Sequence, residues 1–137
     1  MITAKQLVDF AQMLHKTGAV YWYGTFYLRC TDGLYKSKRA QYPAHYTSSR
    51  AAGYRADIRA KKMCVDCIGV IKGAAWTDGG RSNAKYEGGG CPDKSADGMY
   101  SWCLSKCMEH GKPQHIPEIP GLMLHMPGHV GVYVSDR

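Results

Sequence analysis

Apolar residues recur at helical spacing in three parts of the chain, and each part is predicted to form a helix. The first covers residues 4 to 16, after a capping box that starts at Thr3. A second begins at Cys67, with Asp66 as its N-cap, and runs to residue 76; a third is capped by Ser95 and runs to about residue 110, where Gly111 ends it. The side chains expected to face the core are Leu7, Phe10, Ala11 and Leu14 in the first helix, Ile68, Ile71 and Ala75 in the second, and Met99, Trp102, Cys103 and Cys107 in the third.

Alternating apolar residues near the C-terminus predict a β-hairpin. Residues 122 to 126 and 129 to 134 flank Pro127 and Gly128, which are suited to a two-residue turn. Along the second strand, Val130 and the next two alternate valines are expected on one face and His129 on the other. Residues 19 to 29 are rich in β-formers but are interrupted by a glycine, so an extended or looped segment is expected there.

The remaining segments are expected to be mostly irregular. A loop is predicted up to Thr47, followed by a short helix over about residues 49 to 61. Residues 77 to 94 carry several glycines among polar side chains, which predicts a loop.

Length and composition indicate one globular domain covering residues 1–137. Hydrophobic residues make up 45% of the chain and charged residues 21%, which is ordinary for a single folded domain. No apolar stretch is long enough to span a membrane, and no signal peptide is expected, because Lys5 and Asp9 interrupt the apolar residues near the N-terminus. We therefore expect synthesis in a reducing cytoplasm.

The positive charge is concentrated in one segment. The net charge is +7, and residues 35–62 hold eight basic residues against the single acid Asp57. The rest of the chain is neutral, so we expect residues 35–62 to form a basic insertion that faces a polyanion, either a nucleic acid or an anionic cell-wall polymer. The alternative is a solvated cationic face without a partner.

The six cysteines are expected to be free thiols, a metal site or a nucleophile rather than disulfides, because no secretory signal precedes them. Cys64 and Cys67 with Cys103 and Cys107 could supply four thiolates to a structural zinc ion. Such a site would occupy Cys67 and exclude catalysis by its thiol. We expect no metal and no cofactor.

Cys67 and His129 form the most specific candidate site. A thiol at a helix N-terminus meets unpaired backbone N–H groups and the positive end of the helix dipole, both of which favour the thiolate. A histidine on a neighbouring strand can accept the thiol proton and return it to a leaving amine. Gly131 lies on the same strand face as His129 and would let the helix start approach closely.

Three motifs resemble those of the NlpC-type cysteine peptidases, which are papain-like hydrolases of bacterial peptidoglycan. They are YWYGT at residues 21–25, DCIG at residues 66–69 and GHVGVY at residues 128–133. The resemblance implies an α+β papain-like domain in which the helix of the catalytic Cys67 packs on a small antiparallel sheet that carries the base His129. It further implies that Tyr21 lies beside the nucleophile, and we expect Tyr21 and Asp66 to contact the substrate.

The implied activity is cleavage of an amide in the peptidoglycan stem peptide, by an endopeptidase or an N-acetylmuramoyl-L-alanine amidase. A basic single domain without a signal peptide resembles phage endolysins, which are made in the host cytoplasm and reach the cell wall after release. The basic insertion would then attach the enzyme to an anionic cell-wall polymer.

The sequence departs from this family after the histidine strand. Family members place a third polar residue on the next strand to orient the imidazole, and only three residues follow Val134 here. We expect either truncation at the C-terminus, which would leave an open strand edge and favour a homodimer, or an orienting residue from elsewhere. Asp136, His115 and Glu118 are candidates, whereas His125 is expected to pair with Val130 and point away from His129.

Two other functions stay open. The chain could be a cationic module that binds nucleic acid or another polymer through the basic insertion and its tyrosines, with no role for Cys67. It could also be a catalytically degenerate relative of the peptidases, since the orienting residue is missing from its usual place.

Overall fold

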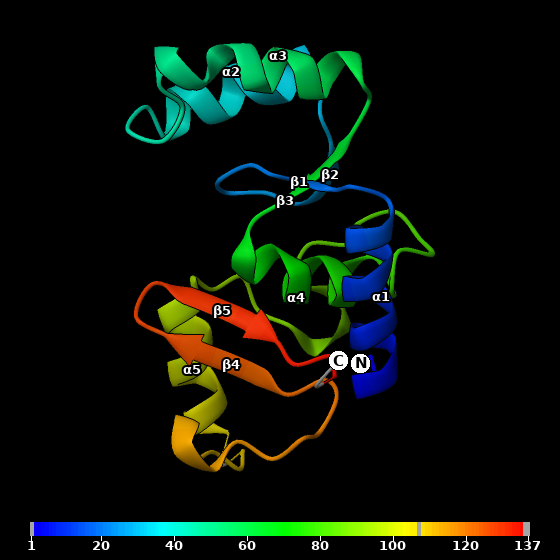
Figure 1. The fold of residues 1–137 in the computed structure, drawn as a ribbon, viewed down its shortest axis with the longest axis vertical. Helices are drawn as coiled ribbons and strands as arrows, with labels where there is room; N and C mark the ends of the chain where they lie inside the picture. Colours follow the sequence, from blue (N-terminus) through cyan, green and yellow to red (C-terminus); the bar gives the residue numbers. More distant parts are fainter. Residues whose placement is uncertain (1, 107, 136–137) are drawn as a thin grey trace.

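Helix α4 lies between two small sheets and joins the parts of the molecule (Figure 1). The structure, a computed structural model, describes residues 2–106 and 108–135. The helices are α1 (Ala4–Lys16), α2 (Asp32–Gln41), α3 (Ala51–Arg59), α4 (Cys67–Trp76) and α5 (Ala96–Ser105), with 3-10 turns η1 (Ser48–Arg50), η2 (Gly88–Gly90) and η3 (Pro113–His115). The strands are β1 (Val20–Tyr21), β2 (Phe26–Arg29), β3 (Met63–Val65), β4 (Met123–Met126) and β5 (His129–Val132). The fold is therefore α+β, with no helix in the described ranges long and apolar enough to cross a membrane.

The first sheet has the order β1-β3-β2 and places β3 in the centre. Strand β3 pairs parallel with β1, where Tyr21 lies opposite Val65, and antiparallel with β2, where Phe26 also lies opposite Val65. The register of β2 shifts between Phe26 and Leu28. Because β3 runs directly into the start of α4, this pairing fixes the beginning of α4 beside the end of β1.

Helix α4 has the bounds predicted from the sequence, including its cap. The Asp66 side chain accepts the backbone N–H of Gly69 at 2.6 Å. Ile68, Ala75 and Trp76 are buried, and they form one hydrophobic cluster with Met99 of α5 and Val130 of β5. The prediction that the cysteine helix packs on the C-terminal hairpin is therefore confirmed.

Helices α2 and α3 form a hairpin on the far side of the first sheet from α4 (Figure 1). The predicted loop is wrong over residues 32–41, which form α2, while α3 with η1 covers much of the predicted helix at 49–61. The Thr31 hydroxyl caps α2 by accepting the N–H of Leu34. Only Tyr35 of α2 is buried, so the helix lacks the apolar stripe that would have predicted it.

An aromatic cluster holds this helical hairpin onto the first sheet. Trp22 is fully buried, and its ring makes edge contacts with Tyr35, Tyr46 and Tyr54 at centroid distances of 5.1 to 6.3 Å. The Trp22 Nε1–H donates to the carboxylate of Asp57 at 2.9 Å. The basic insertion therefore contributes buried tyrosines to a hydrophobic cluster with Trp22, and this cluster packs the insertion against the first sheet.

Helix α5 ends at Ser105, five residues earlier than predicted, and Cys107 lies outside the described residues. The Lys106 N–H donates to both the Trp102 and the Cys103 carbonyls, at 3.2 and 3.1 Å, a tightening typical of the last turn of a helix, and the Ser105 hydroxyl also donates to the Trp102 carbonyl at 2.6 Å. The hairpin β4–β5 has the predicted turn, with Met126 opposite His129 and His125 opposite Val130.

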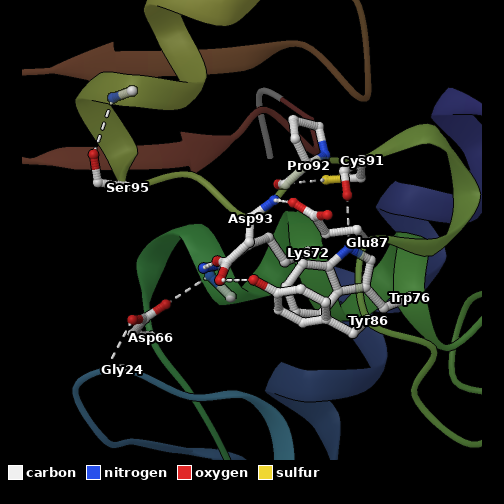
Figure 2. Close-up of polar contacts among 12 residues, drawn as sticks. Gly24, Asp66, Lys72, Trp76, Tyr86, Glu87, Cys91, Pro92, Asp93 and Ser95 are labelled. Carbon is white, nitrogen blue, oxygen red and sulfur yellow. Dashed lines mark hydrogen bonds and ion pairs between the residues drawn. The ribbon is translucent and has the colours of Figure 1, made fainter. Parts of the chain in front are cut away.

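Residues 77–94 form a loop, as predicted, apart from η2, and Figure 2 shows how polar contacts tie it to α4. The Asp93 carboxylate pairs with the Lys72 ammonium at 2.9 Å and accepts the Tyr86 hydroxyl at 2.8 Å. The Trp76 Nε1–H donates to the Cys91 carbonyl at 2.8 Å. These contacts anchor the glycine-rich loop at its end nearest α5.

Replacement of Gly69 by alanine tests the close packing of α4 on the first sheet. A Cβ at Gly69 would overlap with the backbone carbonyl oxygen of Thr25, which cannot move without disturbing the sheet. We predict that Gly69→Ala lowers the free energy of unfolding by at least about 2 kcal/mol, measured by urea denaturation. The control is Gly53→Ala on the exposed face of α3, where nothing lies within 4 Å, and which should stabilise the chain by about 0.5–1 kcal/mol. Equal stability of the native chain and Gly69→Ala would contradict this packing.

Candidate active site

All four predicted site residues line one cavity of about 330 Å³. Tyr21 comes from the end of β1, Asp66 and Cys67 from the start of α4, and His129 from the start of β5. The other lining residues are mostly small and apolar: Ala11, Ala19, Val20, Val65, Val70, Val130, Gly131 and Val132. Three segments that are distant in sequence therefore bring Cys67, His129, Tyr21 and Asp66 to the lining of the same cavity.

Cys67 is the first residue of α4 and is half-buried beside the cavity. The backbone N–H groups of a first helical turn have no partner within the helix, and the positive end of the helix dipole lies there. Negative charge on the Cys67 sulfur would be stabilised at this position. The thiol thus has the location of a nucleophile and also an adjoining cavity in which a substrate can lie.

The other described cysteines lie in settings that disfavour reaction. Burial raises the pKa of Cys30 to about 12 and that of Cys91 to about 11. Burial also raises the pKa of Cys64 and that of Cys103. Because only the thiolate is an effective nucleophile, these four thiols are expected to be slow at neutral pH.

Asp66 connects the start of α4 to the turn between β1 and β2. One carboxylate oxygen accepts the N–H of Gly69 at 2.6 Å. The other accepts the N–H of Gly24 at 2.9 Å, and Figure 2 shows this contact. The backbone N–H of Asp66 donates to the Thr25 carbonyl at 3.0 Å. Burial raises the pKa of Asp66, against the opposing effect of the two N–H donors. Asp66 therefore acts as a positioning residue; contact with a substrate stays a prediction.

Tyr21 presents its phenol to solvent at the edge of the cavity, with 61% of the residue exposed. Partial burial of the phenol and the negative charges of Cys67 and Asp66 raise the pKa of Tyr21 to about 12. The phenol is consequently protonated at neutral pH and available as a hydrogen-bond donor beside Cys67.

His129 is exposed at the first position of β5, and the β4–β5 hairpin packs against α5. The Asp97 carboxylate accepts the N–H of Gly128 at 2.8 Å and also binds the His125 ring at 2.8 Å. The His125 ring stacks on Tyr100 with centroids 4.3 Å apart. Asp97 therefore anchors the turn that immediately precedes His129.

No side chain within the described residues forms a hydrogen bond with His129. His125 is turned to Asp97, as its pairing with Val130 predicts. His115 and Glu118 are exposed on the segment before β4, and Asp136 lies outside the described residues. The third residue expected from the peptidase resemblance is thus not identified by these contacts.

A site with four thiolates is not formed by the described cysteines. Cys64 lies in the aromatic cluster with Cys30, whereas Cys103 packs against the cluster that contains Trp76 and Met99. Cys107 lies outside the described residues, and within them no group of three or more His, Cys, Asp or Glu side chains is arranged to hold a metal.

The role of Asp97 was not anticipated from the sequence. Its position in the first turn after Ser95 is explained by helix capping alone, since acidic residues are favoured there. Its contacts reach residues that are 28 and 31 positions away, and no local sequence pattern reports contacts of that kind.

No protein-family model, curated protein or solved structure matches this chain. The site is therefore interpreted from its geometry and from the motifs that form it.

Alkylation rates test the assignment of Cys67 as the reactive thiol. We predict that iodoacetamide near pH 7 modifies Cys67 at least about tenfold faster than Cys30, Cys64, Cys91 or Cys103, because burial suppresses the other thiolates. Mass spectrometry of peptides sampled over time gives each rate from the same reaction. An inert Cys67 with faster labelling of Cys64 or Cys91 would show that the assignment is wrong.

Proposed function

We propose that this chain is a cysteine hydrolase of the NlpC type with a papain-like fold, and that it cleaves an amide bond of the peptidoglycan stem peptide. The observation that carries the proposal is the single cavity shared by Cys67 at a helix start, His129 on the adjoining hairpin and the phenol of Tyr21. This combination supplies a nucleophile, a base and a hydrogen-bond donor, which are the groups that acyl transfer requires.

The reaction proceeds in two halves. In the first, His129 accepts the thiol proton while the Cys67 sulfur attacks the amide carbonyl carbon, and the proton then passes to the leaving amine as the C–N bond breaks. In the second, His129 takes a proton from water, whose oxygen attacks the thioester and releases a carboxylic acid and the free thiol. The net reaction consumes one amide and one water and needs no cofactor.

Tyr21 and the helix start stabilise the negative charge that develops on the carbonyl oxygen. The Tyr21 phenol is protonated and lies beside Cys67. Backbone N–H groups at the start of α4 provide further donors. Donors that are held in place before the reaction favour the transition state because they need not reorganise.

The cavity and the basic insertion together favour a cell-wall substrate. Alanine and valine side chains line most of the cavity, which suits the short apolar side chains of a stem peptide. Helices α2 and α3 carry an excess of cations that would attach the enzyme to an anionic wall polymer. An endolysin-like enzyme, made in the cytoplasm and active at the wall after release, combines these properties.

The nucleic-acid module is less well supported. Tyr35, Tyr46 and Tyr54 are at most 9% exposed and pack against Trp22, so their rings are not available to stack on bases. A catalytically degenerate hydrolase is the second candidate, because His129 has no orienting side chain among the described residues. Under the proposed function we expect weaker turnover than in an enzyme with a complete triad.

Loss of either reacting group tests the mechanism. We predict that Cys67→Ala and His129→Ala each reduce hydrolysis by about a thousandfold or more, because neither half-reaction can proceed without them. The measurement is release of free amino groups from purified peptidoglycan, with the products identified by mass spectrometry. Cys103→Ala and His15→Ala are matched controls outside the cavity and should retain activity. Undiminished hydrolysis by Cys67→Ala would exclude the proposed chemistry.

Removal of one hydroxyl tests the role of Tyr21. Tyr21→Phe keeps the ring but removes the donor, so we predict a decrease in kcat of about a hundredfold. The free energy of unfolding should hardly change, because Tyr21 is 61% exposed. The control is Tyr86→Phe, which removes an exposed phenol bonded to Asp93 outside the cavity. If both variants keep native kcat, Tyr21 does not act as a donor in the reaction.

A further inference from the structure

A second cavity, of about 460 Å³, lies within the α2–α3 hairpin. It is bounded by both helices and by the chain between them, and shares no lining residue with the cavity of Cys67. Its lining residues are Tyr35, Arg39, Pro43, Tyr46, Thr47, Ser48, Ala51 and Arg55. It thus combines two guanidinium groups and two aliphatic hydroxyls with apolar and aromatic walls.

The positive charge of this cavity is not neutralised within the described chain. Neither Arg39 nor Arg55 forms an ion pair with a described carboxylate. The one acidic residue of the insertion, Asp57, accepts the Trp22 indole N–H instead. Arg39 and Arg55 are exposed residues that line one cavity without a counter-charge, and such a pair favours an anion there, since a guanidinium can donate two parallel hydrogen bonds to it.

The hydroxyl groups that line the cavity indicate which kind of anion it would bind. The Ser48 hydroxyl can donate to a further oxygen atom around a tetrahedral centre, whereas the Thr47 hydroxyl forms a hydrogen bond with the Ser49 hydroxyl at 3.0 Å. A phosphodiester presents two non-bridging oxygens and two ester oxygens around one phosphorus, so it can accept from both guanidinium groups and from the Ser48 hydroxyl, whereas a carboxylate presents only two oxygens in one plane. Because the nearby tyrosine rings pack on Trp22, the cavity lacks exposed faces for stacking nucleobases.

We propose that this cavity binds a phosphodiester group of a polyol-phosphate polymer, with Arg39 and Arg55 as the principal ligands. The phosphate chemistry follows from the cavity itself, while the choice of a cell-wall polymer as its source rests on the proposed function. The site holds the enzyme on the wall and leaves the cavity of Cys67 free for the stem peptide.

Binding of a synthetic poly(glycerol phosphate) chain, measured by isothermal titration calorimetry, tests the proposal. The double variant Arg39→Gln/Arg55→Gln should weaken binding by at least about tenfold, because charge-assisted hydrogen bonds are lost. The matched control is Lys36→Gln/Arg59→Gln, which removes the same charge from exposed positions on the same two helices outside the cavity and should weaken binding less than about threefold. Equal losses in the two variants, or no binding by the native chain, would overturn the site.

Two further ligands test its specificity. Poly-γ-glutamate of equal charge should bind at least about tenfold more weakly than poly(glycerol phosphate), since it offers carboxylates in place of phosphates. Equal affinity for the two polymers would show that the cavity binds any polyanion through its positive charge. Tighter binding of a single-stranded oligonucleotide than of poly(glycerol phosphate) would favour a nucleic-acid partner. Either result contradicts the proposal.

Two variants distinguish failure of the phosphate site from failure of the proposed hydrolysis. Cys67→Ala should bind poly(glycerol phosphate) as the native chain does, and Arg39→Gln/Arg55→Gln should cleave a soluble muropeptide at the native rate. Failure of muropeptide cleavage with retained, arginine-dependent phosphate binding would contradict the hydrolase assignment and the choice of a cell-wall source, but not the phosphate site itself. Loss of muropeptide cleavage in the arginine variant, with native stability, would contradict the separation of the two sites.

Discussion

The Asp66 carboxylate is the constraint on which the architecture of the candidate site depends. Its two oxygens accept N–H groups from Gly24 and Gly69, and its own N–H donates to Thr25. The turn after β1, the end of β3 and the first turn of α4 are thereby held at one point. Gly69 permits this approach, because any side chain there would overlap with the Thr25 carbonyl. Asp66 and Gly69 of the DCIG motif thus have a role in packing, in addition to the proposed chemical role of Cys67.

Two supports bring the candidate reacting groups to one cavity. The first sheet and Asp66 position Tyr21 beside Cys67, while Asp97 of α5 fixes the hairpin that presents His129. The basic insertion lies on the other side of the first sheet, where the aromatic cluster around Trp22 holds it in place. This division explains how one small domain can carry the candidate catalytic cavity together with a separate cationic one.

Local patterns predicted the helix of Cys67 and the hairpin of His129, but they did not predict β3 and gave the segment of Tyr21 only as extended or looped. The capping box at Thr3, the Asp66 cap and the Pro127–Gly128 turn act within a few residues, so the sequence reports α1, α4 and the β4–β5 hairpin directly. Helix α2 was missed because only one of its residues is buried, and no local pattern marks the end of α5 at Ser105. The hydrogen bonds of Asp66 and of Asp97 join residues that are distant in sequence, so they could be found only from the fold.

The proposed hydrolysis requires a covalent bond between Cys67 and the acyl group of the stem peptide, and mass spectrometry can detect this bond. The native chain is mixed with a soluble muropeptide, quenched in acid during turnover and digested. We predict that the peptide containing Cys67 gains the mass of the acyl half of the substrate, with the loss of one hydrogen from the thiol. An adduct on another residue, or turnover that persists after Cys67 has been fully alkylated, would contradict the proposed role of Cys67 as the nucleophile.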